Sequence, residues 1–261
     1  MKLSIYQVDA FASKVFEGNP AAVVPLEAWL PDEVLQAIAT ENNLSETAYI
    51  VQEAAGYRIR WFTPAYEVNL CGHATLATAH TLWQHLDFKG DVLHFSSKSG
   101  PLMVRQEAEG SYTLDFPADP PQVYADKDSI AAALRQPVLE VYKGKDDLMA
   151  VLPKQSLVET LQPDFSAIAG LPCRGLIATA AGETTDFVSR CFYPGAGINE
   201  DPVTGSAHTL MTPFWAEKLG KTDMKAAQLS ARSGKLDCRL EGNRVLISGQ
   251  AQTYMFGEIN F

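Results

Sequence analysis

Two short segments of the chain combine proton-moving side chains with a glycine turn. In the first, Cys71, Gly72 and His73 stand between an aromatic run, residues 57–64, and a nearly uncharged apolar segment that ends at Trp83. We expect this apolar segment to be a buried helix that begins at Gly72. The N–H groups at a helix start carry partial positive charge and bind anions. The segment therefore predicts an anion site beside a thiol and an imidazole.

The second segment repeats the first. Four pairs of identical residues follow one another at an offset of 130 (190 − 60): Arg60 and Arg190, Phe62 and Phe192, Pro64 and Pro194, Asn69 and Asn199. Three residues are then inserted, and Gly72 matches Gly205, which is followed by Ser206. By the first offset Cys71 is equivalent to Asp201, so both are expected to face a cleft shared by two similar halves. A repeat of this length is too long for a solenoid unit.

The elements around these segments predict an α+β protein in two domains, residues 1–117 and 118–261. The boundary is placed at residues 118–121, where two prolines follow Ala118 and Asp119. Each half contains many strand-like segments around one apolar helix, and in the second half that helix covers residues 207–218. Pro213 is expected to bend this helix or to delay its start. The sequence leaves open whether the final strand returns to the first domain.

Composition limits the classes of function. The chain has 261 residues, of which 46% are hydrophobic and 20% charged, with a net charge of −10. The basic residues form no cluster, so nucleic acid and anionic membranes are not expected as partners. No apolar run reaches transmembrane length. The four cysteines have no paired spacing, which favours a reducing, cytoplasmic location. No metal or nucleotide motif is present, and we expect no metal and no cofactor.

Glu46 stands at a predicted strand entrance, after a helix near residues 30–42 and before an apolar run. A carboxyl that approaches the interior at such a place suits proton transfer, because burial favours its neutral form. The residues alone leave open a solvated glutamate with no role in chemistry.

Four motifs together resemble the PhzF family, the phenazine-biosynthesis isomerase and its relatives: Asn19-Pro20, Ser45-Glu46-Thr47, and residues 71–75 and 201–207. The resemblance implies a fold similar to that of diaminopimelate epimerase, with two pseudo-symmetric domains. Each domain would be a β-barrel-like sheet around a central helix, with the active site between them. It also implies a homodimer without a cofactor. By motif match, Glu46 takes the place of the catalytic acid/base, and His73, Asp201 and Ser206 match other polar site positions.

The sequence thus predicts an isomerase that moves a proton on a small, carboxylate-bearing, anionic substrate. Glu46, His73 and Asp201 are the expected catalytic residues. Gly72, Gly205, Ser206 and Cys71 are the expected substrate-binding residues. One alternative is an epimerase or racemase in which Cys71 works opposite a carboxylate; the second copy offers no thiol, which excludes a two-thiol mechanism. The other alternative is a binding protein that keeps the scaffold without catalysis.

Overall fold

The structure is a computed structural model of mixed α/β architecture, and it describes residues 1–107 and 110–261. The chain forms two compact units. Unit 1 contains residues 1–115 and 248–261, and unit 2 contains residues 116–247. The C-terminal segment therefore belongs with the first unit.

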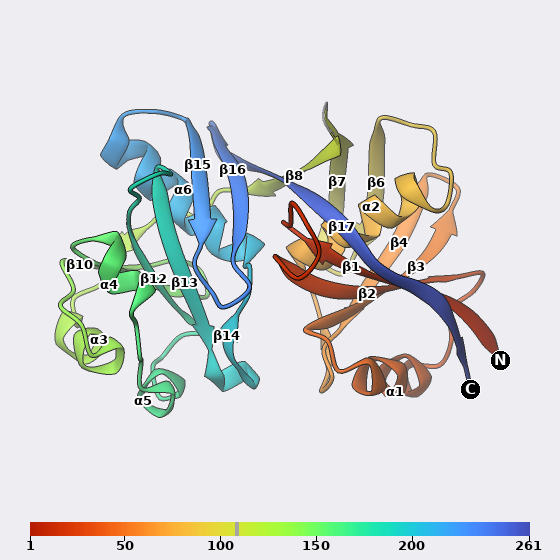
Figure 1. Ribbon diagram of the computed structural model, residues 1–261, viewed down its shortest axis with the longest axis horizontal. Helices are drawn as coiled ribbons and strands as arrows, with labels where there is room; N and C mark the ends of the chain where they lie inside the picture. The colour runs from red at the N-terminus through yellow and green to blue at the C-terminus, as the bar shows by residue number, and fades with distance from the viewer. Residues whose placement is uncertain (108–109) are drawn as a thin grey trace. The chain divides into compact units, whose positions relative to one another are not determined.

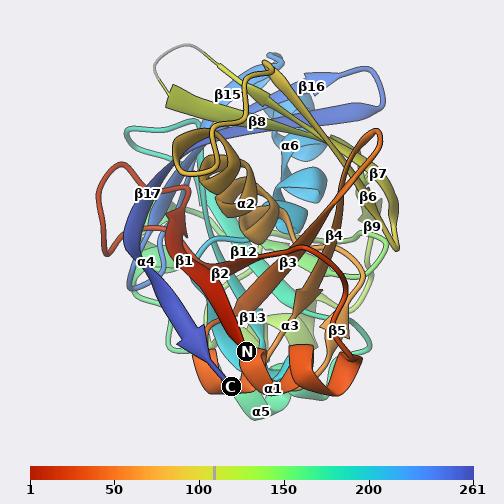
Figure 2. The same cartoon turned by 90° about the vertical axis from the view of Figure 1, so that its right-hand side faces the viewer.

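Unit 1 is built from strands around one central helix (Figures 1 and 2). Its elements are β1 (Lys2–Ala10), β2 (Asn19–Leu26), α1 (Asp32–Asn42), β3 (Glu46–Glu53), β4 (Gly56–Phe62), β5 (Glu67–Val68), α2 (Gly72–Gln84), β6 (Val92–Ser97), β7 (Gly100–Gln106), β8 (Ser111–Pro117) and the end of β17 (Arg244–Asn260). Every residue of α2 from His73 to Leu82 is buried. A helix that is apolar all round can be stable only when other elements cover it on every side, and here the strands of unit 1 do so.

Unit 2 has a similar plan, with more helices outside. Its elements are β9 (Gln122–Val123), α3 (Lys127–Leu134), β10 (Glu140–Lys143), β11 (Leu148–Val151), α4 (Gln155–Glu159), α5 (Phe165–Ala169), β12 (Leu176–Ala181), β13 (Phe187–Tyr193), the 3₁₀ turn η2 (Pro194–Ala196), β14 (Ile198–Asp201), α6 (Gly205–Leu219), β15 (Asp223–Gln228), β16 (Gly234–Glu241) and the start of β17. Most of α6 is buried, and the helix contacts β15 and β16.

The two units pair their strands in the same pattern. In unit 1, β4 is antiparallel to β3 and parallel to β6. In unit 2, β13 is antiparallel to β12 and parallel to β15. The buried helix enters at the same point of each unit, between β5 and β6 in one and between β14 and β15 in the other. A parallel pair needs a long crossover connection, and α2 and α6 provide it.

Pro213 neither ends nor delays helix α6, which begins at Gly205 and continues through the proline. The prediction of a delayed start is wrong. A proline has no N–H to donate to the carbonyl four residues earlier, here that of Thr209. The backbone N–H of Asp119 donates to this carbonyl at 3.0 Å instead, so the acceptor that Pro213 leaves unpaired finds a partner in the same unit.

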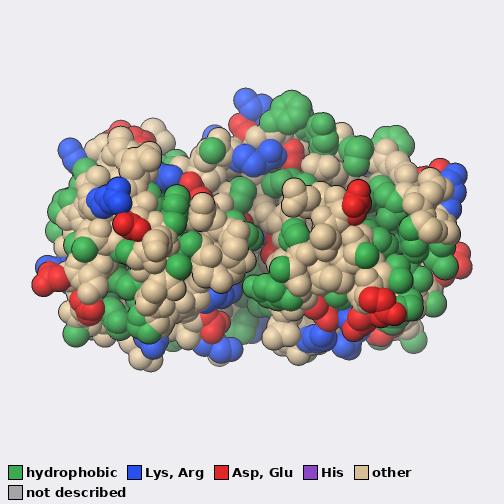
Figure 3. All heavy atoms as spheres, turned by 90° about the horizontal axis from the view of Figure 1, so that it is seen from below, with side chains coloured by type: hydrophobic (Ala, Val, Ile, Leu, Met, Phe, Trp, Pro, Cys, Tyr) green, Lys and Arg blue, Asp and Glu red, His purple; other side chains and the backbone are tan. Residues whose placement is uncertain are grey.

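The surface carries charges of both signs. Acidic and basic side chains are interspersed on the face shown in Figure 3. Within residues 1–107 and 110–261, no helix has the length and apolar character that a membrane crossing needs.

Candidate active site

Glu46 and His73 meet at the start of α2. Glu46 is the first residue of β3, which runs parallel to β2 with Glu46 opposite Ala21. The Oε2 atom of Glu46 lies 3.0 Å from Nε2 of His73. Only 14% of the Glu46 side chain and 6% of the His73 side chain are exposed. Strand pairing and the helix start thus bring an acid and a base into hydrogen-bond distance, as general acid/base catalysis requires.

The other ring nitrogen of His73 has two neighbours. Nδ1 lies 3.2 Å from the side-chain amide of Asn19 and 3.5 Å from the sulfur of Cys71. The oxygen and nitrogen of an amide are similar in shape, so the Asn19 side chain can flip. Its N–H group then faces an unprotonated Nδ1, or its oxygen faces a protonated one. Asn19 thereby fixes the ring while Nε2 keeps its contact with Glu46.

Burial and charge oppose one another at this cluster. Burial disfavours the charged imidazole of His73, but the sulfur of Cys71 and the carboxylate of Glu46 favour it, and together they raise the pKa of His73 well above its ordinary value. Burial raises the pKa of the Cys71 thiol to about 11, and the Glu46 carboxylate adds to this rise. The Glu46 carboxylate therefore favours the protonated form of the imidazole and disfavours a thiolate at Cys71.

Asp201 lies beside the start of α6 in unit 2. Its carboxylate accepts a hydrogen bond from the hydroxyl of Thr204. The fully buried side chain of Gln228 accepts from the Thr204 N–H at 2.9 Å and donates to the Asp201 carbonyl at 2.7 Å. Gln228 therefore fixes the turn that leads from β14 into α6. Nothing in the sequence pointed to this glutamine.

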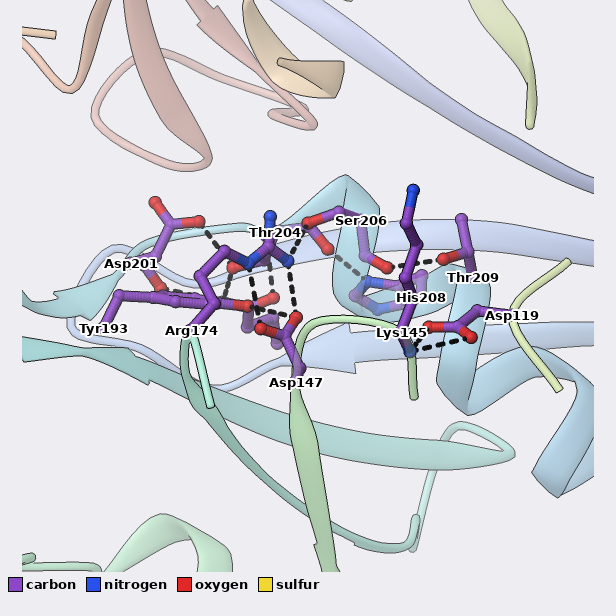
Figure 4. A network of polar contacts seen from close by, with 11 residues as sticks. Asp119, Lys145, Asp147, Arg174, Tyr193, Asp201, Thr204, Ser206, His208 and Thr209 are labelled. Carbon is purple, nitrogen blue, oxygen red and sulfur yellow. Dashed lines mark hydrogen bonds and ion pairs between the residues drawn. The ribbon is translucent and has the colours of Figure 1, made fainter. Parts of the chain in front are cut away.

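Ser206, the second residue of α6, belongs to a further polar network (Figure 4). Its hydroxyl accepts a hydrogen bond from Arg174 at 3.0 Å, and Arg174 is also paired with Asp147. Neither residue was predicted from the sequence, because an isolated Arg and an isolated Asp that lie 27 residues apart carry no motif.

The strand register corrects two equivalences between the copies, that of Asp201 with Cys71 and that of Asn199 with Asn69. Trp61 pairs with Val68 in unit 1, and the matching Cys191 pairs with Asp201 in unit 2. Asp201 is therefore the counterpart of Val68, and the expected equivalence of Asp201 with Cys71 is wrong. The residue equivalent to Cys71 is Thr204, since these two precede α2 and α6 directly. The three inserted residues lie before β14, where the 3₁₀ turn η2 has formed.

The structure thus groups the predicted residues by unit. Glu46, Cys71 and His73 lie together at the start of α2, and their ligand atoms are within 4.8 Å of one another. A carboxylate, a thiol and an imidazole at this spacing could also hold a divalent metal ion. Asp201 and Ser206 lie at the start of α6. That the two groups face a shared pocket stays a prediction.

Comparison with known proteins shows which proteins the chain resembles. The family model for phenazine biosynthesis-like proteins, PhzC-PhzF, matches residues 8–257. An uncharacterized isomerase of Pseudomonas aeruginosa is 54% identical over 260 residues, covering 100% of both chains. Another uncharacterized isomerase, from Halalkalibacterium halodurans, is 42% identical over 266 residues and covers 99% of each chain.

Solved structures show the same relationship. The crystal structure of a PhzF-family protein from Enterococcus faecalis is 48% identical, covers 100% of both chains and gives a TM-score of 0.97. A hydroxyproline epimerase of Agrobacterium vitis shares only 10% identity, yet 99% of this chain and 92% of that chain superpose with a TM-score of 0.63. The mixed fold is therefore one that epimerases also adopt. With relatives named as isomerases along its whole length, the chain is an isomerase, and it belongs to the PhzC-PhzF family of phenazine biosynthesis-like proteins.

Proposed function

We propose that the chain is a cofactor-independent isomerase in which Glu46 moves a proton on a small, carboxylate-bearing substrate. The observation that carries the proposal is the 3.0 Å contact between Glu46 Oε2 and His73 Nε2 in a largely buried setting. A buried carboxylate is costly without a partner or a task. Here the partner is an imidazole that Asn19 fixes from its other side.

The proposed reaction needs neither oxidant nor reductant. The Glu46 carboxylate takes a proton from an activated carbon, and the electron pair left behind delocalises over the substrate's double bonds. The resulting carboxylic acid returns the proton to a different carbon, so a double bond changes place and the atoms balance. The His73 ring, with Nε2 3.0 Å from Glu46 Oε2, holds the carboxylate in place by charge attraction until the carboxylate accepts the proton.

The substrate's carboxylate is expected to use main-chain N–H groups at helix starts. Neither Cys71 before α2 nor Thr204 before α6 makes a side-chain cap hydrogen bond to its helix in the described residues. The first N–H groups of a helix have no partner within the helix, and anions bind them. Gly72, Gly205 and Ser206 stay the proposed substrate-binding residues on this ground, and Asp201 stays the proposed third catalytic residue.

We further propose that the two units are pseudo-symmetric domains, each a barrel-like sheet around its helix. Besides the shared strand pairing, each unit holds one bidentate ion pair at the same place. Arg60 contacts both oxygens of Glu67 at 2.8 Å, and Arg190 contacts those of Glu200 at 2.6 and 2.8 Å. In unit 1 this pair joins β4 to the short strand β5, and in unit 2 it joins β13 to the short strand β14. Each short strand precedes the buried helix of its unit. A homodimer and a cytoplasmic location also stay proposals.

A proton-exchange experiment tests the function. Cyclic amino and hydroxy acids are incubated with the protein in D₂O, and deuterium incorporation is followed by NMR. Glu46→Gln is expected to lower the rate by at least ~100-fold, the usual scale for loss of a general acid/base. Glu53→Gln, on the exposed end of the same strand, is the matched control and should change nothing.

Full exchange activity in Glu46→Gln would end the proposal. The assay is run with and without EDTA, because Glu46, Cys71 and His73 could also hold a metal ion. Activity that disappears with EDTA and returns with a divalent cation would replace acid/base catalysis by Glu46 alone with a metal-dependent mechanism.

A further inference from the structure

Arg174 is held rigidly beside the start of α6. Its Nε and Nη2 atoms donate to the two carboxylate oxygens of Asp147 at 2.9 and 2.5 Å. The ring of Tyr193 lies 5.3 Å from the guanidinium carbon, and the Tyr193 hydroxyl donates to Asp147 at 3.3 Å. Asp147 is only 4% exposed. A planar guanidinium that is paired bidentately and stacked on an aromatic ring has one orientation.

Arg174 stays charged although its side chain is only 43% exposed. Partial burial disfavours a charged guanidinium, but the hydrogen bonds to Asp147 and the acidic groups nearby together outweigh this and raise the pKa of Arg174. Asp147 thus keeps Arg174 charged and fixed, and it occupies only one edge of the guanidinium.

The remaining contact of Arg174 sets the direction of a hydroxyl. Nη2 donates to Oγ of Ser206 at 3.0 Å (Figure 4). A guanidinium can donate hydrogen bonds but cannot accept them. Ser206 must therefore accept with its oxygen, and its own proton points away from Arg174. Ser206 is the second residue of α6, so its hydroxyl lies at the helix start, where the first N–H groups have no partner within the helix.

The strand register places this arrangement next to the position that corresponds to the acid/base pair in unit 1. Thr47 pairs with Phe62, and Leu176 pairs with Phe192, the residue that matches Phe62. Glu46 is therefore equivalent to Gly175, the neighbour of Arg174. Gly72 and Gly205 begin the two helices, so His73 is equivalent to Ser206. One helix start carries a carboxylate and an imidazole, and the other carries a guanidinium and a hydroxyl.

We propose that Arg174 is a positioning residue that turns the Ser206 hydroxyl toward the substrate, so that the hydroxyl and the start of α6 together recognise a carboxylate. This inference rests on the proposed function and deepens it, because it names the residue that orients the Ser206 hydroxyl for carboxylate binding. Asp147 and Tyr193 contribute by fixing Arg174. The substrate class selected is a carboxylic acid in its ionised form, in preference to the matching neutral amide.

Calorimetric titration with two probes tests this assignment. Anthranilate carries the carboxylate on a small planar ring, and anthranilamide is its neutral analogue. Ser206→Ala and Arg174→Met are each expected to weaken anthranilate binding by ~10-fold, the effect of losing one charge-assisted hydrogen bond, and to leave anthranilamide binding unchanged. The double variant should bind like either single variant, because Arg174 acts through Ser206. Arg135→Met, which removes an exposed ion pair with Asp164 in the same unit, is the control.

This role of Arg174 is overturned if Arg174→Met weakens the binding of both probes equally, if its effect adds to that of Ser206→Ala, or if the unaltered protein does not prefer anthranilate. Thermal unfolding of each variant checks that it is folded. If Arg174→Met does not fold, the comparison of the two probes is made with Ser206→Ala. Binding needs no proton transfer, so the same titrations can be made with Glu46→Gln. They test the recognition of the carboxylate independently of the proposed acid/base role of Glu46.

Discussion

Cys71 is expected to be a spectator of the reaction. Its thiol has a pKa of about 11 instead of the ordinary 9.0, chiefly because it is buried. At pH 8 about one molecule in 1,000 then carries a thiolate, against about one in ten for an ordinary thiol. Since only the thiolate reacts with alkylating agents, ionisation alone slows alkylation by ~100-fold. The residue is only 7% exposed, which slows the reaction further.

The assay is timed alkylation by iodoacetamide at pH 8, with each cysteine quantified by mass spectrometry of its peptide. Glutathione in the same tube gives the rate of an unhindered thiol, and denatured protein shows that all four cysteines are free to react. Cys71 should react at least ~100-fold more slowly than glutathione. Cys71→Ala should keep the deuterium exchange that Glu46→Gln loses.

Rapid alkylation of Cys71, or loss of exchange in Cys71→Ala with the fold intact, would refute this reasoning. It would favour the alternative in which Cys71 removes a proton from one face of a carbon while a carboxylate works on the other. Inversion at a single carbon, instead of migration of a double bond, would then be the expected product.

Two further predictions concern stability and assembly. Burial lowers the pKa of His80 and His208 to about 4, whereas in the unfolded chain both histidines bind a proton near pH 6.5. Their contribution to the free energy of unfolding is therefore complete above pH 6.5 and is lost as the pH falls toward 4. The loss should reach up to ~3 kcal/mol per histidine in urea unfolding; a wild-type loss no larger than that of His208→Gln would contradict this. Near the end of β17, Tyr254, Met255 and Phe256 are 50, 44 and 72% exposed, which predicts that this strip joins two copies. Phe256→Asp should then lower the molar mass in sedimentation equilibrium. An unchanged dimer in this variant, or a monomeric wild type, would contradict the prediction that the strip joins two copies.

The sequence predicted the elements with local signals well. The glycine turn before a run without charge predicted a buried helix, and α2 begins at Gly72. The strand beginning at Glu46 was expected from the apolar run that follows it. Pro213 misled, because the hydrogen bond that compensates for it comes from Asp119, far away in the chain. Tertiary partners of this kind leave no trace in a local pattern.

The candidate site was predictable only in part, for the same reason. Glu46 and His73 stood in motifs, and the structure brings them together across 27 residues. Arg174 and Asp147 stood in none, and their pairing follows from the parallel register of β11 and β12. The offset of 130 suggested that Asp201 is equivalent to Cys71, because sequence matching could not tell on which side of the short strand β14 the three extra residues lie. Strand pairing decides this, since Cys191 lies opposite Asp201.

The C-terminal strand makes unit 1 discontinuous in the chain, and this has a consequence for synthesis on the ribosome. Residues 251–260 pair with β1, so β1 lacks this partner until these residues have been made and released. Unit 2 is a continuous segment, and all of it is synthesised before this strand. Although domains generally fold in N-to-C order during translation, here the later unit can complete its fold first. The Glu46 half then stays unfinished until residues 251–260 can reach β1.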